Sequence, residues 1–157
     1  MARRKNRETE MEKILTGEQL TDNLNKRLEK LSPDSFAKYI SELQETPSIK
    51  RLFDKYIEHY GVSRTDIVNR SEMSKSYAYE ILNGVKENPS RDSLIRLCLG
   101  AHMDLNTTQY TLKVGGAGEL YAKVPRDAAI MIHINQKEWN VVKLNIFLDE
   151  KGLKPLQ

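Results

Sequence analysis

Apolar residues recur at helical spacing along most of this 157-residue chain. The clearest example lies in the sequence "TPSIKRLFDKYIEHYG", where the intervals between apolar residues are three, one, three and one. The residues concerned are Ile49, Leu52, Phe53, Tyr56 and Ile57. This spacing is typical of a helix with one buried face. Gly61 follows directly, so we expect it to end the helix as a C-terminal glycine.

The sequence predicts two more helices before this one. In residues 16–31 the intervals between leucines are four, four and three, at Leu20, Leu24, Leu28 and Leu31. Such a narrow apolar stripe on a charged helix needs a surface to pack against. Ser32 precedes Pro33, and Thr46 precedes Pro47. Because serine and threonine favour the N-cap and proline the first helical position, both pairs predict a helix start.

The stretch "GVSRTDIVNRSEMSKSYAYEILNG", residues 61–84, predicts two short helices with a sharp turn between them. Ser63 is followed three residues later by Asp66, a capping-box pattern with a shorter acid, and this helix is expected to end near Ser71. Ser74 is the predicted cap of the second helix. That helix runs to Asn83 and stops at glycine 84.

The second helix of this pair has an unusual polar face. On a helical wheel one side carries Ser74, Ala78 and Ile81. The opposite side carries Ser76, Tyr79, Glu80 and Asn83, where only the tyrosine ring is apolar. Two short helices at a fixed angle, with the polar face of the second turned outward, fit the geometry of a helix in the major groove of DNA. The helix N-terminus, which includes Lys75, also offers backbone donors to phosphate oxygens.

The stretch "GVSRTDIVNRSEMSKSYAYEILNGVKENPSRDSLIRLCLGAHMDL" resembles the DNA-binding domain of the lambda-repressor-like, or XRE, transcriptional regulators. The resemblance covers residues 49 to about 112. The matching positions are Arg64, Ser74, Lys75, Ser76, Asn83, Gly84, Pro89, Ser90, Leu94, Ile95, Leu97 and Cys98. The chain departs from the family at two positions, where Glu72 replaces the usual glycine of the turn and Val68 an alanine.

The resemblance implies an all-α, five-helix DNA-binding domain and a set of DNA-contacting residues. It implies that Arg64 contacts phosphate, and that the loop with Lys86 and Arg91 lies against the duplex. It further implies that the second helix of the pair, residues 74–83, reads bases or backbone. The residues expected there are Ser74, Lys75, Ser76, Tyr77, Tyr79, Glu80 and Asn83.

A glycine-rich break, "KVGGAGELYAKVP", precedes the C-terminal part. Two helices are predicted there, at about 126–135 and 138–150, ended by Gly152 and then Pro155. The second helix is more apolar than an isolated hairpin requires, with Trp139, Val142, Leu144, Ile146 and Leu148. Either this tail packs on the helix-turn-helix domain and completes its core, or it forms a dimer surface.

These elements suggest four parts. Residues 1–15 form a disordered basic arm, 16–45 an N-terminal helical extension, 46–115 the lambda-repressor-like domain, and 116–157 a C-terminal helical hairpin. The arm carries Arg3, Arg4, Lys5 and Arg7. Such a block suits phosphate contacts, and it is equally common as an inert terminus.

Charge and composition limit the possible partners. The whole chain has a net charge of +3, and residues 61–103 hold six bases against five acids. The bases are Arg64, Arg70, Lys75, Lys86, Arg91 and Arg96, and the acids are Asp66, Glu72, Glu80, Glu87 and Asp92. This balance favours selective over indiscriminate DNA binding. The longest apolar run, 128–132, is far shorter than the roughly 20 residues of a membrane span, so we expect a cytoplasmic protein with no membrane partner.

The residues that enzymes need are sparse. Cys98 is the only cysteine and lies among apolar residues, which indicates a small core residue. The three histidines are far apart, and none of the pairs has the spacing of metal ligands on one helix turn. The chain has no phosphate-binding glycine loop and no nucleophile elbow. We therefore expect no enzyme activity, no metal and no cofactor.

The sequence thus predicts a DNA-binding transcriptional regulator, acting as a repressor that occupies double-stranded DNA as a homodimer. The alternative is a helix-turn-helix-derived protein-interaction module, antitoxin-like or an adaptor. In that case the stripe of Leu20, Leu24 and Leu28 or the C-terminal hairpin would hold a partner protein. Near-neutral charge and Glu80 favour the alternative. The caps, the basic arm, Lys75 and Ser76 favour DNA.

Overall fold

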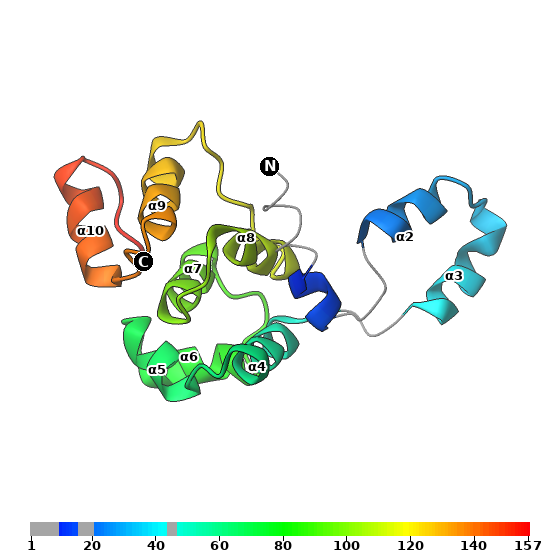
Figure 1. Ribbon diagram of the computed structural model, residues 1–157, viewed down its shortest axis with the longest axis horizontal. Coiled ribbons are helices and arrows are strands. Elements are labelled where there is room, and N and C mark those ends of the chain that lie inside the picture. The colour runs from blue at the N-terminus through cyan, green and yellow to red at the C-terminus, as the bar shows by residue number, and fades with distance from the viewer. Residues whose placement is uncertain (1–9, 16–20, 44–46) are drawn as a thin grey trace. The chain divides into compact units, whose positions relative to one another are not determined.

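The computed structural model describes residues 10–15, 21–43 and 47–157 (Figure 1). All regular structure in these residues is helical, which confirms the predicted all-α class. The chain divides into two compact units, Met1–Pro47 and Ser48–Gln157. The predicted arm residues Arg3, Arg4, Lys5 and Arg7, together with Leu20 and Thr46, lie outside the described residues.

In the N-terminal unit the helical residues 10–15 bury Met11, Glu12 and Leu15, whereas the helices that follow bury little. Residues 10–15 are helical, and α2 (Thr21–Leu28), the 3₁₀ helix η1 (Pro33–Ser35) and α3 (Phe36–Glu42) follow. Pro33 opens η1 as predicted, but the side chain of Ser32 makes no capping hydrogen bond. No residue of α2 is buried, and in α3 only Tyr39 is. The leucine stripe of α2 therefore lies largely at the surface, with Leu28 46% exposed.

Arg27 links α2 to α3. Its guanidinium forms an ion pair with Glu42 and lies 5.5 Å from the centroid of the Tyr39 ring. The side chains of Arg27 and Glu42 are about two-fifths exposed, 41% and 39%. Exposed pairs of this kind stabilise by at most about 1 kcal/mol, so this link is weak.

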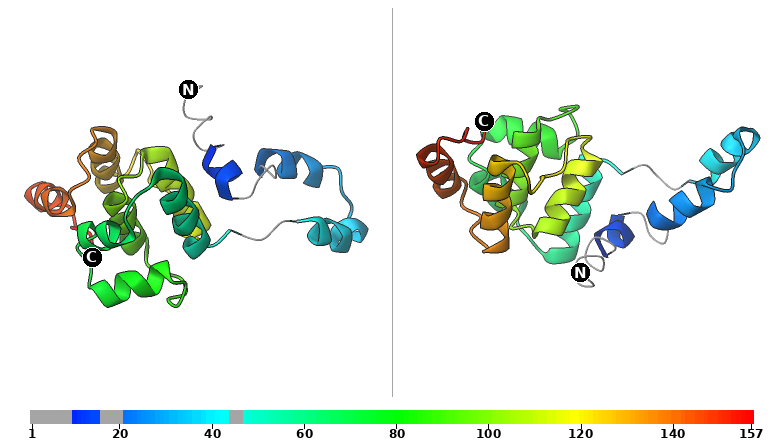
Figure 2. Two further views of the ribbon diagram at one scale, coloured as in Figure 1. Left: turned by 60° about the horizontal axis from the view of Figure 1, so that its bottom comes forward. Right: turned by 90° about the horizontal axis from the view of Figure 1, so that it is seen from above.

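The C-terminal unit contains seven α-helices in the described residues. They are α4 (Ile49–Tyr60), α5 (Arg64–Arg70), α6 (Lys75–Leu82), α7 (Arg91–Gly100), α8 (Leu105–Val114), α9 (Pro125–Asn135) and α10 (Val141–Glu150). Two further views show α8 lying between α4 and α9, with α10 beside α9 (Figure 2). No helix of the described residues is long and apolar enough to span a membrane.

Side-chain caps set most helix starts in this unit. The capping side chains, each accepting the N–H of the residue three positions on, are Ser48, Ser63, Ser74, Ser90, Asp104 and Asn140. Ser63, Ser74 and the left-handed Gly61 confirm the predictions. The predicted start at Thr46 and Pro47 is wrong, because Ser48 caps α4 and Pro47 lies before the helix. A serine directly before the apolar run offers a hydroxyl at the N-cap itself.

Helix α7 lies at the centre of this unit. Seven of its ten residues are buried, and it packs against α5, α8 and α10. A Cβ at Gly100 would lie 2.4 Å from the carbonyl oxygen of Ile67, so α5 approaches α7 more closely than any side chain permits. Cys98 is fully buried, as predicted, and burial raises the pKa of its thiol to about 12.

The C-terminal hairpin shares a core with α7 and α8. The shared apolar cluster comprises Leu94, Ile95, Leu99, Leu112, Leu120, Ala129, Ile130, Ile134, Val141, Leu144, Leu148 and Leu156. This confirms the interpretation that the tail completes the core. Helix α10 begins three residues later than predicted, because Asn140 caps it and residues 136–140 form the connecting turn. Gly152, left-handed at φ 69°, follows α10 as predicted.

Candidate nucleic-acid interface

The start of α5 is fixed by local contacts. The hydroxyl of Ser63 accepts the N–H of Asp66 at 3.2 Å, and Ile67 and Val68 are buried. At the other end the Ser71 hydroxyl donates to the Val68 carbonyl at 2.6 Å. The predicted helix bounds and buried face are confirmed.

The turn between α5 and α6 contains a residue in a rarely used backbone conformation. Glu72 has φ 56°, in the left-handed region that favours glycine. At this position the family that the sequence resembles usually has a glycine. The chain therefore makes the backbone shape of a glycine with a non-glycine residue, and the surrounding structure must hold it there.

Helix α6 has one buried and one solvent-facing side. The buried residues are Ala78, Ile81 and Leu82, each at most 1% exposed. Lys75, Ser76, Glu80 and Asn83 are exposed, and Tyr77 and Tyr79 are half-buried. Ser74 is exposed and caps the helix, accepting the N–H of Tyr77 at 3.3 Å. The wheel prediction of a polar outer face is confirmed.

Arg64, the first residue of α5, joins three helices. It donates to the Asp54 carboxylate of α4 at 3.3 Å and also to the Asn83 side-chain oxygen at the end of α6. Asp54 in turn pairs with Lys50 at 2.5 Å. Arg64 thus lies beside the outer face of α6, with part of its charge balanced by Asp54.

Lys86 and Arg91, predicted together, have different surroundings. Lys86 is exposed in the loop after α6. Arg91 donates to the carbonyls of Gly118 and Glu119 at 2.8 and 3.0 Å and forms a two-pronged pair with Asp127 at 2.6 and 3.0 Å. These four hydrogen bonds fasten the start of α7 to α9 and the loop before it, which favours a structural role for Arg91. The other nine residues predicted to contact DNA lie on α6, at its two ends or in the loop that follows, except for Arg64, which begins α5.

The guanidinium of Arg96 of α7, a residue that the sequence pattern did not mark as functional, contacts the α5–α6 turn. It donates to the carbonyls of Ser71 and Glu72 at 3.1 and 3.3 Å. One signal was available in the sequence, because Arg96 is the only charged residue in the apolar run 94–100. A lone arginine in a buried helix commonly satisfies backbone carbonyls nearby.

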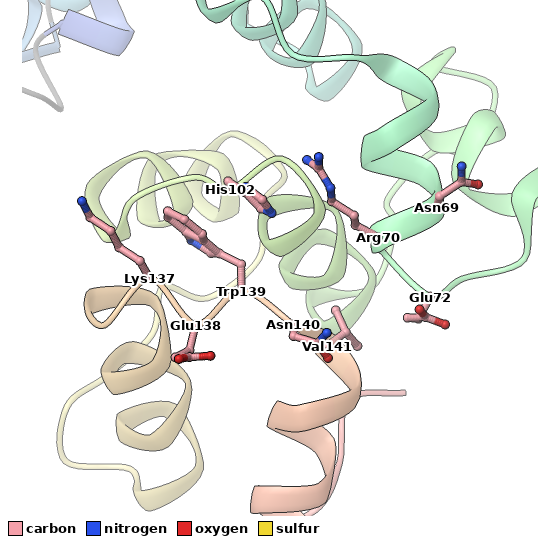
Figure 3. Close-up of a pocket in the computed structure, with 9 residues that line it drawn as sticks. All are labelled: Asn69, Arg70, Glu72, His102, Lys137, Glu138, Trp139, Asn140 and Val141. Carbon is pink, nitrogen blue, oxygen red and sulfur yellow. The ribbon is translucent and has the colours of Figure 1, made fainter.

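A cavity of about 470 Å³ opens on the same unit, next to the end of α5 (Figure 3). Its lining residues are Asn69, Arg70, Glu72, His102, Lys137, Glu138, Trp139, Asn140 and Val141. The His102 and Trp139 rings stack at 4.6 Å, and the Trp139 indole N–H donates to the Met103 carbonyl at 2.9 Å. Burial, then the nearby Arg70, lowers the pKa of His102. The lining carries two cationic side chains and two carboxylates, so its charge does not favour one class of ligand over another.

The described residues contain no group of three or more His, Cys, Asp or Glu side chains that could hold a metal ion. No protein-family model, curated protein or solved structure matches this chain. The assignment of a function therefore depends on the geometry of α5, α6 and the residues around them.

Proposed function

We propose that this protein is a sequence-specific DNA-binding transcription regulator, a repressor of the lambda-repressor-like type, which inserts α6 into the major groove. The observation that carries the proposal is the division of α6 into two sides. Ala78, Ile81 and Leu82 anchor the helix, while a polar face is presented to solvent. A recognition helix needs this combination, because rigid anchoring fixes the positions of the side chains that contact base edges.

The first turn of α6 suits contact with phosphate. Lys75 and Ser76 are both exposed there. Backbone N–H groups in the first turn of a helix have no acceptor within the helix, and they favour anions together with the helix dipole. A phosphate at this end would fix the register of the helix in the groove.

The charges around α6 support selective binding. Glu80 is exposed on the outer face and can accept a hydrogen bond from the amino group of cytosine. It would also repel a phosphate at a wrongly positioned site. Residues 61–103 are nearly neutral, with six bases against five acids, so the basic arm of residues 3–7 would supply further phosphate contacts. Paired half-sites on DNA would be read by two copies of the chain.

The test is binding to the DNA upstream of the protein's own gene over a series of salt concentrations. The informative variant combines Lys75→Ala with Tyr79→Ala. Its matched control combines Lys143→Ala with Tyr121→Ala, which are an exposed lysine and tyrosine on α10 and the loop before α9. We expect the control to bind like the native protein, and the α6 variant to bind at least about tenfold more weakly with a shallower salt dependence.

The proposal is wrong if the native protein binds this DNA no better than a random duplex at low salt. Equal losses in the α6 variant and the control would contradict the assignment of α6 as the reading helix. Both variants are measured over the same salt series, because the loss of one phosphate contact changes the slope of log affinity against log salt concentration by about one.

A second candidate function is protein interaction, and exposed apolar residues in the N-terminal unit favour it. Phe36 is 67% exposed, and Ile40, one turn later in α3, is 47% exposed. Adjacent exposed apolar side chains of this size are more typical of a surface that binds a partner than of a surface that stays in contact with water. The test has two steps. Affinity capture with this protein first isolates a partner protein, and the complex is then reconstituted from the two purified proteins. Such a complex should form with the native chain and be lost with Phe36→Ser plus Ile40→Ser.

A further inference from the structure

One side chain connects the α5–α6 turn to residues 156–157. The Arg96 guanidinium binds the carbonyls of Ser71 and Glu72 in the turn. It also donates to the carbonyls of Leu156 and Gln157 at 2.8 and 3.0 Å. Four backbone oxygens from two segments far apart in sequence thus share one rigid, planar donor.

The contacts in the turn lie on both sides of Glu72. The carbonyl of Ser71 belongs to the peptide plane before Glu72, and the carbonyl of Glu72 belongs to the plane after it. The angle between these planes is set by the φ and ψ of Glu72, whose φ is 56°. Both carbonyls accept from the same Arg96 nitrogen, so the arginine holds the two planes together in the left-handed arrangement.

The C-terminal segment is itself firmly held. Arg126 of α9 donates to the carbonyls of Lys154 and Pro155 at 2.7 and 3.2 Å. The N–H of Gln157 donates to Asp92 at 3.0 Å, and the N–H of Leu156 donates to Asn145 at 2.8 Å. The Leu156 side chain lies in the shared core. Residues 154–157 therefore form a fixed support on which the Arg96 guanidinium rests.

We infer that Arg96, supported by residues 154–157, is a positioning residue that fixes α6 relative to α5 by holding Glu72 in its left-handed conformation. A glycine would take this conformation without help, whereas a glutamate needs outside contacts to keep it. The C-terminal segment thereby contributes to the way α6 presents its outer face. The inference rests on the proposed function, because the outer face matters only if it reads DNA.

The experiment compares Arg96→Lys with Arg126→Lys. Both variants keep the positive charge and give up guanidinium contacts to residues 154–157, but only Arg96 also contacts the turn. Two quantities are measured: amide hydrogen exchange of residues 72–78 without DNA, and affinity for the upstream DNA. Chemical denaturation of each variant provides the correction for any change in global stability.

We expect Arg96→Lys to speed exchange in the turn and to weaken specific DNA binding by about tenfold or more, because misaligned side chains lose their base contacts. Arg126→Lys loosens only the support of the Arg96 guanidinium, so it should speed exchange in the tail, speed exchange in the turn less than Arg96→Lys does, and weaken DNA binding by less than Arg96→Lys does. Glu72→Gly added to Arg96→Lys should restore much of the lost affinity, since glycine relieves the need for the arginine.

The outcomes separate the inference from the proposed function. Unchanged exchange in the turn of Arg96→Lys overturns the inference, whether or not the native protein binds DNA. Faster exchange with unchanged DNA affinity overturns the claim that the turn positions α6 for reading. Absence of specific binding by the native protein contradicts the proposed function, and the exchange data still decide whether Arg96 holds the turn.

Discussion

The two units of the chain use similar sequence patterns with different results. Helices α2 and α3 have apolar residues at helical spacing, and η1 between them has a serine–proline start, yet α2 and α3 together bury only Tyr39. In the C-terminal unit α7 alone buries seven of ten residues. Helical periodicity is present in both units, so it does not by itself determine whether a helix has a core to join.

The difference lies in the partners that each helix finds. α2 and α3 have eight and seven residues, a length at which an isolated helix is marginal in water. The helices of the C-terminal unit are also short, but each packs against at least one other helix. Tertiary packing of complementary faces therefore accounts for most of the stability of the C-terminal unit.

The largest expected contrast comes from the same substitution in each unit. Ile130 of α9 is fully buried in the shared core, while Ile40 of α3 is 47% exposed. Ile130→Ala should lower the free energy of unfolding by about 3 kcal/mol through lost burial and a residual cavity. Ile40→Ala should change it by at most about 0.5 kcal/mol, because it leaves no cavity and alanine favours helix.

Urea denaturation of the full chain, followed by circular dichroism, measures both effects. A loss of about 2 kcal/mol or more in Ile40→Ala would contradict the comparison, since it would mean that α3 has a substantial core. A loss under about 1 kcal/mol in Ile130→Ala would mean that the C-terminal hairpin contributes little to the fold.

The features that the sequence predicted well are local ones. The ends of α5 and α6 follow from Ser63, Ser74 and the residues within a few positions of them. Gly61 and glycine 84 take the left-handed conformation expected at a helix end. Capping involves residues three or four apart, so adjacent letters of the sequence contain the information needed.

The features that the sequence did not predict depend on distant residues. The family resemblance implies a DNA contact for Arg91, but it gives no sign of the structural partner Asp127, which lies 36 positions away. Arg96 contacts carbonyls 24 to 61 positions away. A charged residue in a sequence indicates that a partner is needed, and only the packed helices show which partner it meets.

The next contrast concerns a buried charge. Burial alone would raise the pKa of Asp127, but hydrogen bonds from Arg91 and from the Tyr121 N–H outweigh it and lower the pKa. The folded state therefore favours the ionised carboxylate. Asp127→Asn should cost about 2 kcal/mol at neutral pH, the typical contribution of hydrogen bonds to a charged group. Asp22→Asn in α2, where no residue is buried, should cost at most about 0.5 kcal/mol.

The pH dependence tests the cause of this effect. Because the folded pKa is depressed, the stabilisation by Asp127 is complete above the unfolded pKa of about 4 and is lost as pH falls through the folded value. The difference in melting temperature between the native protein and Asp127→Asn should thus stay constant from about pH 7 to 5 and shrink below about pH 4. A difference that persists unchanged at about pH 2 would point to shape, not charge, as its origin.

The smallest contrast compares two serines at predicted helix starts. Ser63 accepts the N–H of Asp66, whereas the side chain of Ser32 makes no capping bond. Ser63→Ala should therefore lower the free energy of unfolding by about 1 kcal/mol, and Ser32→Ala by no more than about 0.3 kcal/mol. Hydrogen exchange at the Asp66 amide provides a local readout, because loss of the cap frees that N–H first. Equal losses in the two variants would show that Ser32 caps its helix in solution, and the N-terminal unit would then share the local order of the C-terminal one.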